Sequence, residues 1–433
     1  MSKAEKAQAV GAIAKNPNVS LETFAHLDID RLLRKIDLRL IPMLTLLARQ
    51  RPLHRPRTLM YDHSSFTAFF FTYCAFEVPS NIILKRLRPS IWLPTIMVAW
   101  GIVMTLMGLV KSYSGLLTAR IFLGVAEAGL FPGVVYYNTM WYCRYEIQVR
   151  QAYFFSAASV AGAFSGLLAY GISFMDGVGN LAGWRWIFIL EGILTVLVAI
   201  TAFFVLVDYP ETASFLTIEE RAFITYRLKY DNQSPTTSSS SLIPQTESLS
   251  RKHLISAFRD WQIWLNVIVY WGYVCPLYGI SLFLPTIIKE LGYKTTTAQL
   301  LTVPIYVTAG IITIVIAYIA DRKRIRSPFI LGGLITQLIG FIMCISTSSP
   351  GVTYAGIFIA ACGIYECQPS NITWLSNNLA GSYKRAVGMG IQISVGNLAG
   401  GLGVQADQWE AAGGGGVVDG GKEKKTEAGK MVR

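Results

Sequence analysis

Charge is scarce in this sequence. Only 15% of its 433 residues are Asp, Glu, Lys or Arg, whereas 52% are hydrophobic and the mean hydropathy is +0.43. A soluble protein needs a more strongly charged surface, so these values exclude an ordinary soluble globular protein. They favour a polytopic membrane protein.

A cleavable leader is also missing. The first 35 residues carry many charges and lack the short apolar core and small-residue cleavage site of a secretory signal peptide. We expect neither a signal peptide nor a transit peptide, and insertion would use the membrane spans themselves.

The motifs of enzymes and metal sites are missing as well. The sequence contains no HExxH helix, nucleophile elbow or Gly-rich phosphate loop; its six Cys form no CxxC pair, and its four His lie outside the apolar windows. We therefore expect no enzyme activity, no metal and no cofactor, and we interpret the cysteines as packing residues. A membrane enzyme is the least favoured class.

Long apolar windows are what the sequence does contain. About 20 helical residues cross a hydrocarbon core, and ten windows are long enough. They lie at 65–84, 91–110, 117–140, 151–173, 186–207, 262–288, 299–320, 328–347, 351–374 and 386–404.

The basic residues lie at alternate connections between these windows. KRLR at 85–88 and DRKRIR at 321–326 are basic, while the connections near 111–116 and 289–298 hold few Lys or Arg. This is the positive-inside pattern, which predicts a cytoplasmic N-terminus. It also accounts for the net charge of +12 without nucleic-acid binding.

The polar stretch 208–260 divides the windows into two groups, and its Ser-rich composition predicts a flexible cytoplasmic linker. We expect a cytoplasmic tail at 1–35, an N-terminal bundle at 36–207, a C-terminal bundle of five spans at 261–404 and a disordered Gly-rich tail at 405–433. Two repeated halves of this kind are typical of a secondary transporter.

Two regions interrupt the pattern. Segment 36–48 begins like a first span, but 49–64 is too rich in Arg and Pro to continue as a buried helix, and no apolar window follows 404. We therefore expect a truncated first helix and a missing twelfth helix. A truncated, non-transporting product or a nutrient receptor is the alternative function.

Five runs form a joint pattern: FEVPSNIILKRLRPSIWLP (76–94), RIFLGVAEAGLFPGVVYY (120–137), GWRWIFILEG (183–192), DYPETASFLTIEER (208–221) and WLSNNLAG (374–381). Together they resemble the fungal branch of the anion:cation symporter family, within the major facilitator superfamily. This branch includes allantoate, nicotinate and pantothenate permeases, and the nicotinate permease-like subgroup is the most similar. The resemblance implies an all-α fold of two six-helix bundles, here incomplete. It implies a monomer in the plasma membrane that takes up a small organic anion with protons by alternating access.

Glu127 is the leading candidate for proton coupling. It follows Arg120 by seven residues, which places both on nearly one helix face, ~10 Å apart along the axis. A carboxylate inside a membrane is costly as a charge, so Glu127 is suited to binding and releasing a proton. The resemblance associates a glutamate of the fourth helix with this role, and a structural carboxylate is the alternative. Glu366 occupies the comparable place in the other half.

Other polar residues are candidates for substrate binding and gating. Arg120 attracts an organic anion or extends to the membrane interface. The substrate candidates on two later windows are Asn266, Tyr270, Tyr273, Tyr278, Gln392 and Asn397. The resemblance implies cytoplasmic gating clusters of Glu77, Lys85 and Arg86 in one half and Asp321, Arg322 and Arg324 in the other.

Overall fold

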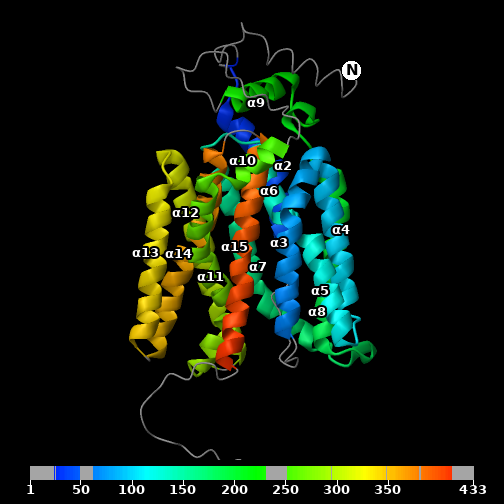
Figure 1. The fold of residues 1–433 in the computed structure, drawn as a ribbon, viewed down its shortest axis with the longest axis vertical. Coiled ribbons are helices and arrows are strands. Elements are labelled where there is room, and N and C mark those ends of the chain that lie inside the picture. Colours follow the sequence, from blue (N-terminus) through cyan, green and yellow to red (C-terminus); the bar gives the residue numbers. More distant parts are fainter. Residues whose placement is uncertain are drawn as a thin grey trace, which may run out of the picture.

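The computed structural model describes residues 24, 26–48, 62–230, 251–293, 295–347, 349–379 and 382–411. All regular secondary structure in these residues is helical. The long helices stand side by side, and α9 and α10 lie at one end of the bundle (Figure 1). We call this end the linker end.

The first half follows the expected windows closely. α2 begins at Ile29 rather than at 36, because the Asp28 carboxylate accepts the Asp30 and Arg31 amides (3.0 and 3.2 Å) and caps the helix. α3 begins at Asp62, so the end of the segment expected to be irregular is helical, while 49–61 lies outside the described residues. The helices are α2 (Ile29–Ala48), α3 (Asp62–Arg86), α4 (Pro89–Met107), α5 (Tyr113–Glu127), α6 (Leu130–Thr139), α7 (Ile147–Ser173) and α8 (Gly183–Val205), with the short η2 (Val178–Asn180).

The second half contains five long helices. α15 continues to Ala411, so residues 405–411, expected to belong to a disordered tail, are helical, and 412–433 lie outside the described residues. α15 stands between the two groups and packs along α3 (Figure 1). The helices are α11 (Trp261–Glu290), α12 (Thr295–Lys323), α13 (Ser327–Ser346), α14 (Pro350–Asn378) and α15 (Ser382–Ala411).

Within the described residues, seven helical segments are long and apolar enough to cross a membrane, and one of them, Tyr113–Thr139, combines α5 and α6. They coincide with seven of the ten expected windows. The other three windows, 151–173, 351–374 and 386–404, lie on α7, α14 and α15, which are 27, 29 and 30 residues long but carry more polar side chains. α7 packs against α12 and α14 of the second half, and α15 packs against α3 of the first half, so the polar residues of these helices lie inside the protein.

The window at 117–140 is broken into α5 and α6. Proline lacks an amide proton, and its ring collides with the carbonyl four residues earlier. Pro132 therefore prevents a regular helix from passing through residue 128, and α5 ends at Glu127 while α6 begins at Leu130. The break places Glu127 at the end of a helix inside the bundle.

The linker is helical in part rather than uniformly flexible. It contains η3 (Pro210–Thr212), α9 (Ile218–Tyr230) and α10 (Arg251–Phe258), while 231–250 lies outside the described residues. Thr217 and Glu220 form a capping box: the Thr217 amide donates to Glu220 Oε2 (2.8 Å), and the Glu220 amide donates to Thr217 Oγ1 (3.2 Å). This TIEE signal marks the start of α9.

Candidate functional site

Two glycines bring α5 and α3 into close contact. A Cβ added to Gly124 would lie 2.7 Å from the Phe69 carbonyl oxygen, and one added to Gly129 would lie 2.7 Å from Ser80 Cβ. Small residues allow membrane helices to approach at backbone distance. The stretch of α3 between Phe69 and Ser80 therefore lies level with the end of α5.

Glu77 lies on this stretch of α3, level with Glu127. Its side chain is fully buried, and neither of its carboxylate oxygens has a hydrogen-bond partner among the described residues. The charge of Glu127 acts on Glu77, so the two carboxyl groups are close enough to interact. Glu77 was expected in a charged gating cluster with Lys85 and Arg86; the structure places it in the interior instead, and the Lys85 and Arg86 side chains lie outside the described part.

Arg120 lies two turns before Glu127 on α5 and is only 5% exposed. The sequence left open a side chain that extends to the membrane interface; in the structure the side chain packs within the protein. Arg120 therefore places a guanidinium inside the first half, on the helix that carries Glu127.

The second half holds a buried polar cluster between α11 and α14. The rings of Tyr270 and Tyr273 lie 5.2 Å apart, and both side chains are fully buried. Gln368 Nε2 donates to the Tyr270 hydroxyl and Asn371 Nδ2 donates to the Tyr273 hydroxyl, each at 3.2 Å. Gln368 and Asn371 were not predicted, although the run QPSN inside an apolar window was a signal that pointed to them.

The substrate candidates of α11 and α15 pair with each other across these two helices. Gln392 donates to Asn266, and the Tyr278 hydroxyl donates to Asn397 Oδ1 at 3.1 Å. The structure thus brings the predicted residues together as two pairs beside the tyrosines. Within this set of side chains, three buried amide oxygens have no hydrogen-bond partner among the described residues: Gln368 Oε1, Asn371 Oδ1 and Gln392 Oε1.

Glu366 points away from these amides, toward α13. A Cβ added to Gly333 would collide with its Oε2, so the glycine makes room for the carboxyl group. Glu366 Oε1 lies 3.5 Å from Ser370 Oγ, and Oε2 lies 3.9 Å from Cys367 Sγ. Among the described residues, no group of three or more His, Cys, Asp or Glu is placed to hold a metal ion.

The two halves contact each other along two seams. On α3 and α15, the Ser394 hydroxyl donates to the Cys74 carbonyl at 2.6 Å. On α7 and α12, the Ser156 hydroxyl donates to the Gly310 carbonyl at 2.8 Å. These contacts lie deep in the bundle, so the halves are joined through its interior.

A third set of contacts joins the halves at the linker end. Asp321 Oδ2 accepts the Val149 amide of α7 at 3.0 Å, and Asp321 Oδ1 lies 3.1 Å from Arg326 Nη2. Arg326 also donates to the Arg144 carbonyl, and its Nε donates to Gln148 Oε1 at 2.9 Å. We call these five residues the latch, because Asp321 and Arg326 of one half hold Arg144, Gln148 and Val149 of the other.

The predicted gating cluster of the second half contributes one residue to the latch. Asp321 is buried in it, whereas Arg322 and Arg324 are exposed. The Arg324 guanidinium lies over the Tyr145 ring, 5.3 Å from its centroid. Arg326 was not predicted. The packing of α7 decides that Arg326, rather than one of its basic neighbours, joins the latch.

Ion pairs fasten α9 and α2 to the bundle outside the latch. Although partial burial raises the pKa of Glu220, hydrogen bonds from Lys35 and from the Thr217 amide outweigh it and hold that pKa below its usual value. The pairs are Lys35–Glu220 (2.7 Å), Arg150–Asp37 (2.7 Å) and Arg227–Glu146 (2.5 Å).

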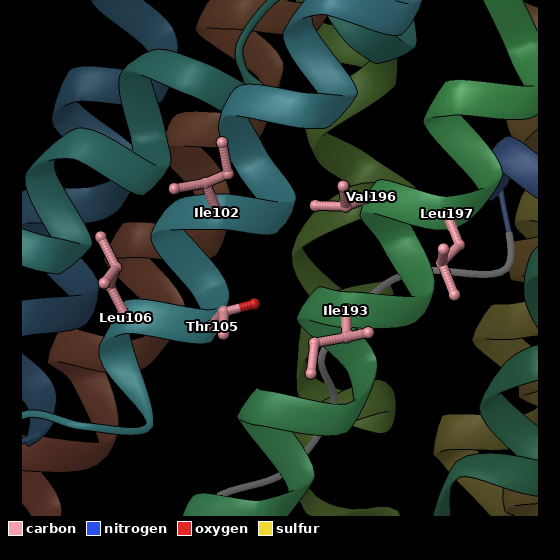
Figure 2. A pocket seen from close by; sticks show the side chains of 6 residues that line it. All are labelled: Ile102, Thr105, Leu106, Ile193, Val196 and Leu197. Carbon is pink, nitrogen blue, oxygen red and sulfur yellow. The ribbon is translucent and has the colours of Figure 1, made fainter.

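An apolar groove lies apart from all these polar groups. It runs between α4 and α8, which approach closely: a Cβ added to Gly101 would lie 2.9 Å from the Gly192 carbonyl oxygen. Figure 2 shows the side chains that line it, and Thr105 is the one with an oxygen atom. They are Ile102, Thr105, Leu106, Ile193, Val196 and Leu197. This composition suits contact with lipid rather than with a charged solute.

Together, the two helical halves, the apolar spans and the buried polar groups between them define a multi-pass membrane transporter. Residues 42–404 match the model of the Major Facilitator Superfamily, and the chain belongs to that family. The family membership and the all-α fold expected from the sequence are thereby confirmed.

Relatives and solved structures agree with this assignment. The chain is 34% identical over 431 residues to the MFS-type transporter cnsO of Penicillium expansum, covering 92% of this chain and 82% of that protein. It is 30% identical over 387 residues to the high-affinity nicotinic acid transporter of Saccharomyces cerevisiae, covering 86% and 70%. The fold is similar to that of the xylose transporter XylE from E. coli in a partially occluded inward-open conformation (TM-score 0.58, 13% identity, 93% and 91% covered).

Proposed function

We propose that this protein takes up a small organic anion together with protons by alternating access. The observation that carries the proposal is the pair of interacting carboxyl groups in the first half, the fully buried Glu77 and the half-buried Glu127. Two neighbouring carboxylates repel each other, and charges inside a membrane are costly, so such a pair is suited to binding and releasing a proton. We assign the proton-coupling role to Glu127.

The substrate class follows from the groups that face the interior. The buried guanidinium of Arg120 suits a carboxylate, and the pair Tyr270 and Tyr273 offers apolar rings with hydroxyl groups. The unpartnered amide oxygens of Gln368 and Asn371 can accept hydrogen bonds from a solute. A monocarboxylate such as nicotinate fits this set, and the similarity to a nicotinic acid transporter supports the choice.

We propose that the linker end faces the cytoplasm of a plasma-membrane protein, and the distribution of Lys and Arg supports this orientation. The latch then closes the cytoplasmic side, and transport requires it to open after the anion and proton bind. Asp321 and Arg326 act as the gate.

Uptake of radiolabelled nicotinate in a yeast strain that lacks its own nicotinate permease tests the proposal. We expect accumulation above the empty vector, greater at about pH 5 than at about pH 7 and abolished by a protonophore. Unlabelled pantothenate and allantoate, added as competitors, define the anion class. A chain that reaches the cell surface without uptake of any of these anions favours the alternative, a non-transporting receptor.

A further inference from the structure

A continuous hydrogen-bond chain links the buried Glu366 to the latch. Arg326 Nε donates to Gln148 Oε1 at 2.9 Å, and Gln148 Nε2 donates to Ser370 Oγ at 2.7 Å. Ser370 Oγ donates to Glu366 Oε1 at 3.5 Å. The chain starts at the linker end, passes through α7 of the first half and ends in the middle of α14.

Every donor in this chain points the same way. A guanidinium can only donate, so Gln148 must turn its oxygen toward Arg326 and its NH₂ group toward Ser370. The serine oxygen accepts from Gln148 and its hydroxyl proton is left for Glu366. A cation therefore stands at one end and a carboxyl group at the other, and an ionised Glu366 polarises each bond along the chain.

We propose that Ser370 and Gln148 are positioning residues that couple the charge of Glu366 to closure of the latch. An ionised Glu366 is a strong acceptor and holds Ser370, Gln148 and Arg326 in the closed arrangement. A proton added to the Glu366 carboxylate removes the negative charge at the end of the chain. The bonds between the halves then weaken, and the linker end opens more readily.

The surroundings of Glu366 suit this role. The titratable groups that face it are Cys367 on its own helix and Tyr273 on α11. α13 presents the uncharged Gly333, and α7 presents Gln148 through Ser370. α12 presents Tyr306, which packs on Tyr365 with ring centroids 6.0 Å apart. The cation in this series of hydrogen bonds is Arg326, and Asp321 contacts it at the end of the series that is remote from Glu366.

This inference rests on the proposed function for its purpose, since a proton-driven importer has to open inward when protonated. Glu127 and Glu366 then have separate tasks. Glu127 of the first half couples proton and substrate, and Glu366 of the second half releases the latch.

Maleimide labelling of the native Cys143 tests the coupling without any substrate. Cys143 is buried beside Arg144 of the latch, so opening of the linker end exposes its thiol. The full chain is purified into nanodiscs and labelled at about pH 6 and about pH 9, and the modified peptide is quantified by mass spectrometry. Cys143→Ser is the blank. Each labelling rate is divided by the labelling rate of Glu366→Gln at the same pH, because this removes the intrinsic pH dependence of the thiol reaction.

We expect the relative labelling of the unmodified chain to be slow at the higher pH and to approach the Glu366→Gln rate at the lower pH. Ser370→Ala should label about fivefold faster than the unmodified chain at the higher pH and lose the pH response. Ser370→Thr keeps the hydroxyl group and should behave like the unmodified chain. The double variant Glu366→Gln/Ser370→Ala should label no faster than Glu366→Gln alone, because both changes break one chain.

Either of two results overturns the coupling. In the first, Ser370→Ala labels with the rate and pH response of the unmodified chain. In the second, the double variant labels at a rate that is the product of the separate effects of Glu366→Gln and Ser370→Ala. If Ser370→Ala folds poorly, its Tm will be lowered. The coupling then depends on Ser370→Thr, which must retain the pH response of labelling. Absence of anion uptake would contradict the proposed function and leave the labelling result unaffected.

Discussion

Glu77 of α3 is fully buried and lies level with Glu127 of α5, close enough for the two carboxyl groups to interact. The close packing of the two helices at Gly124 and Gly129 fixes this relationship. A polar group buried in a membrane protein without a partner is costly for stability, so its retention indicates a function. In the proposed function, this pair is the proton-binding site of the first half.

Glu77→Gln should preserve or raise the stability of the protein and still alter uptake. The substitution removes no hydrogen bond among the described residues and removes a charge that acts on Glu127. We expect the free energy of unfolding to fall by less than about 0.5 kcal/mol, while the pH dependence of nicotinate uptake changes. Tm of the purified protein and uptake across pH measure the two effects, and a large loss of Tm with unchanged pH dependence would speak against the pair.

Gly129→Ala should destabilise the contact between α3 and α5. The added methyl group would collide with the Ser80 hydroxyl, and overpacking of this kind costs about 1–3 kcal/mol. Gly279→Ala is the matched control, since nothing lies within 4 Å of its added Cβ. We expect Tm to fall for Gly129→Ala only and to recover in part when Ser80→Ala is added; an equal effect of both glycine substitutions would contradict the packing.

Arg326→Lys should weaken the latch although it keeps the charge. A lysine ammonium cannot reach Gln148, Asp321 and the Arg144 carbonyl with the fork geometry that Arg326 uses. We expect the free energy of unfolding to fall by about 1–3 kcal/mol, which a lowered Tm would show. Maleimide labelling at the linker end should be faster. Arg322→Lys, an exposed neighbour, should leave both unchanged, and equal behaviour of the two variants would show that Arg326 does not hold the halves together.

The ion pair of Glu220 with Lys35 should make docking of α9 sensitive to acid. The pKa of Glu220 is lowered in the folded protein, so its stabilisation is present at neutral pH and is lost as the pH falls through that lowered value. Glu220→Gln should remove this acid sensitivity and lower the free energy of unfolding by less than about 1 kcal/mol, because the glutamine oxygen can still accept the Thr217 amide while the ion pair with Lys35 is lost. Glu219→Gln is the control because Glu219 is exposed; limited proteolysis near α9 across pH reports the difference. An unchanged acid profile for Glu220→Gln would contradict the assignment.

The sequence predicts the helices better than it predicts their partners. All ten apolar windows fall on helices, because span length and hydropathy are local properties. The capping box of Thr217 and Glu220 is also local and marks the start of α9. The polar composition of the linker nevertheless predicts a flexible segment there, because composition does not register a single cap.

The contacts between the halves could not be predicted from local pattern. Gln148 meets Ser370 across 222 positions of the chain, and Arg326 meets Gln148 across 178. Basic residues at 322–326 look equivalent in sequence, and only the packing of α7 against α12 and α13 selects Arg326. For the same reason the interior position of Glu77 was not expected.

Glu127→Gln bears most directly on proton-coupled uptake. Glutamine keeps the size and polarity of the side chain and cannot carry a proton between pH 5 and pH 7. Radiolabelled nicotinate uptake is compared for the unmodified chain, Glu127→Gln and the exposed control Glu290→Gln, with equal amounts of protein at the cell surface. We expect Glu127→Gln to lose accumulation driven by external acid by about tenfold, with the control unchanged. Undiminished acid-driven accumulation by Glu127→Gln would contradict the proton-coupling role.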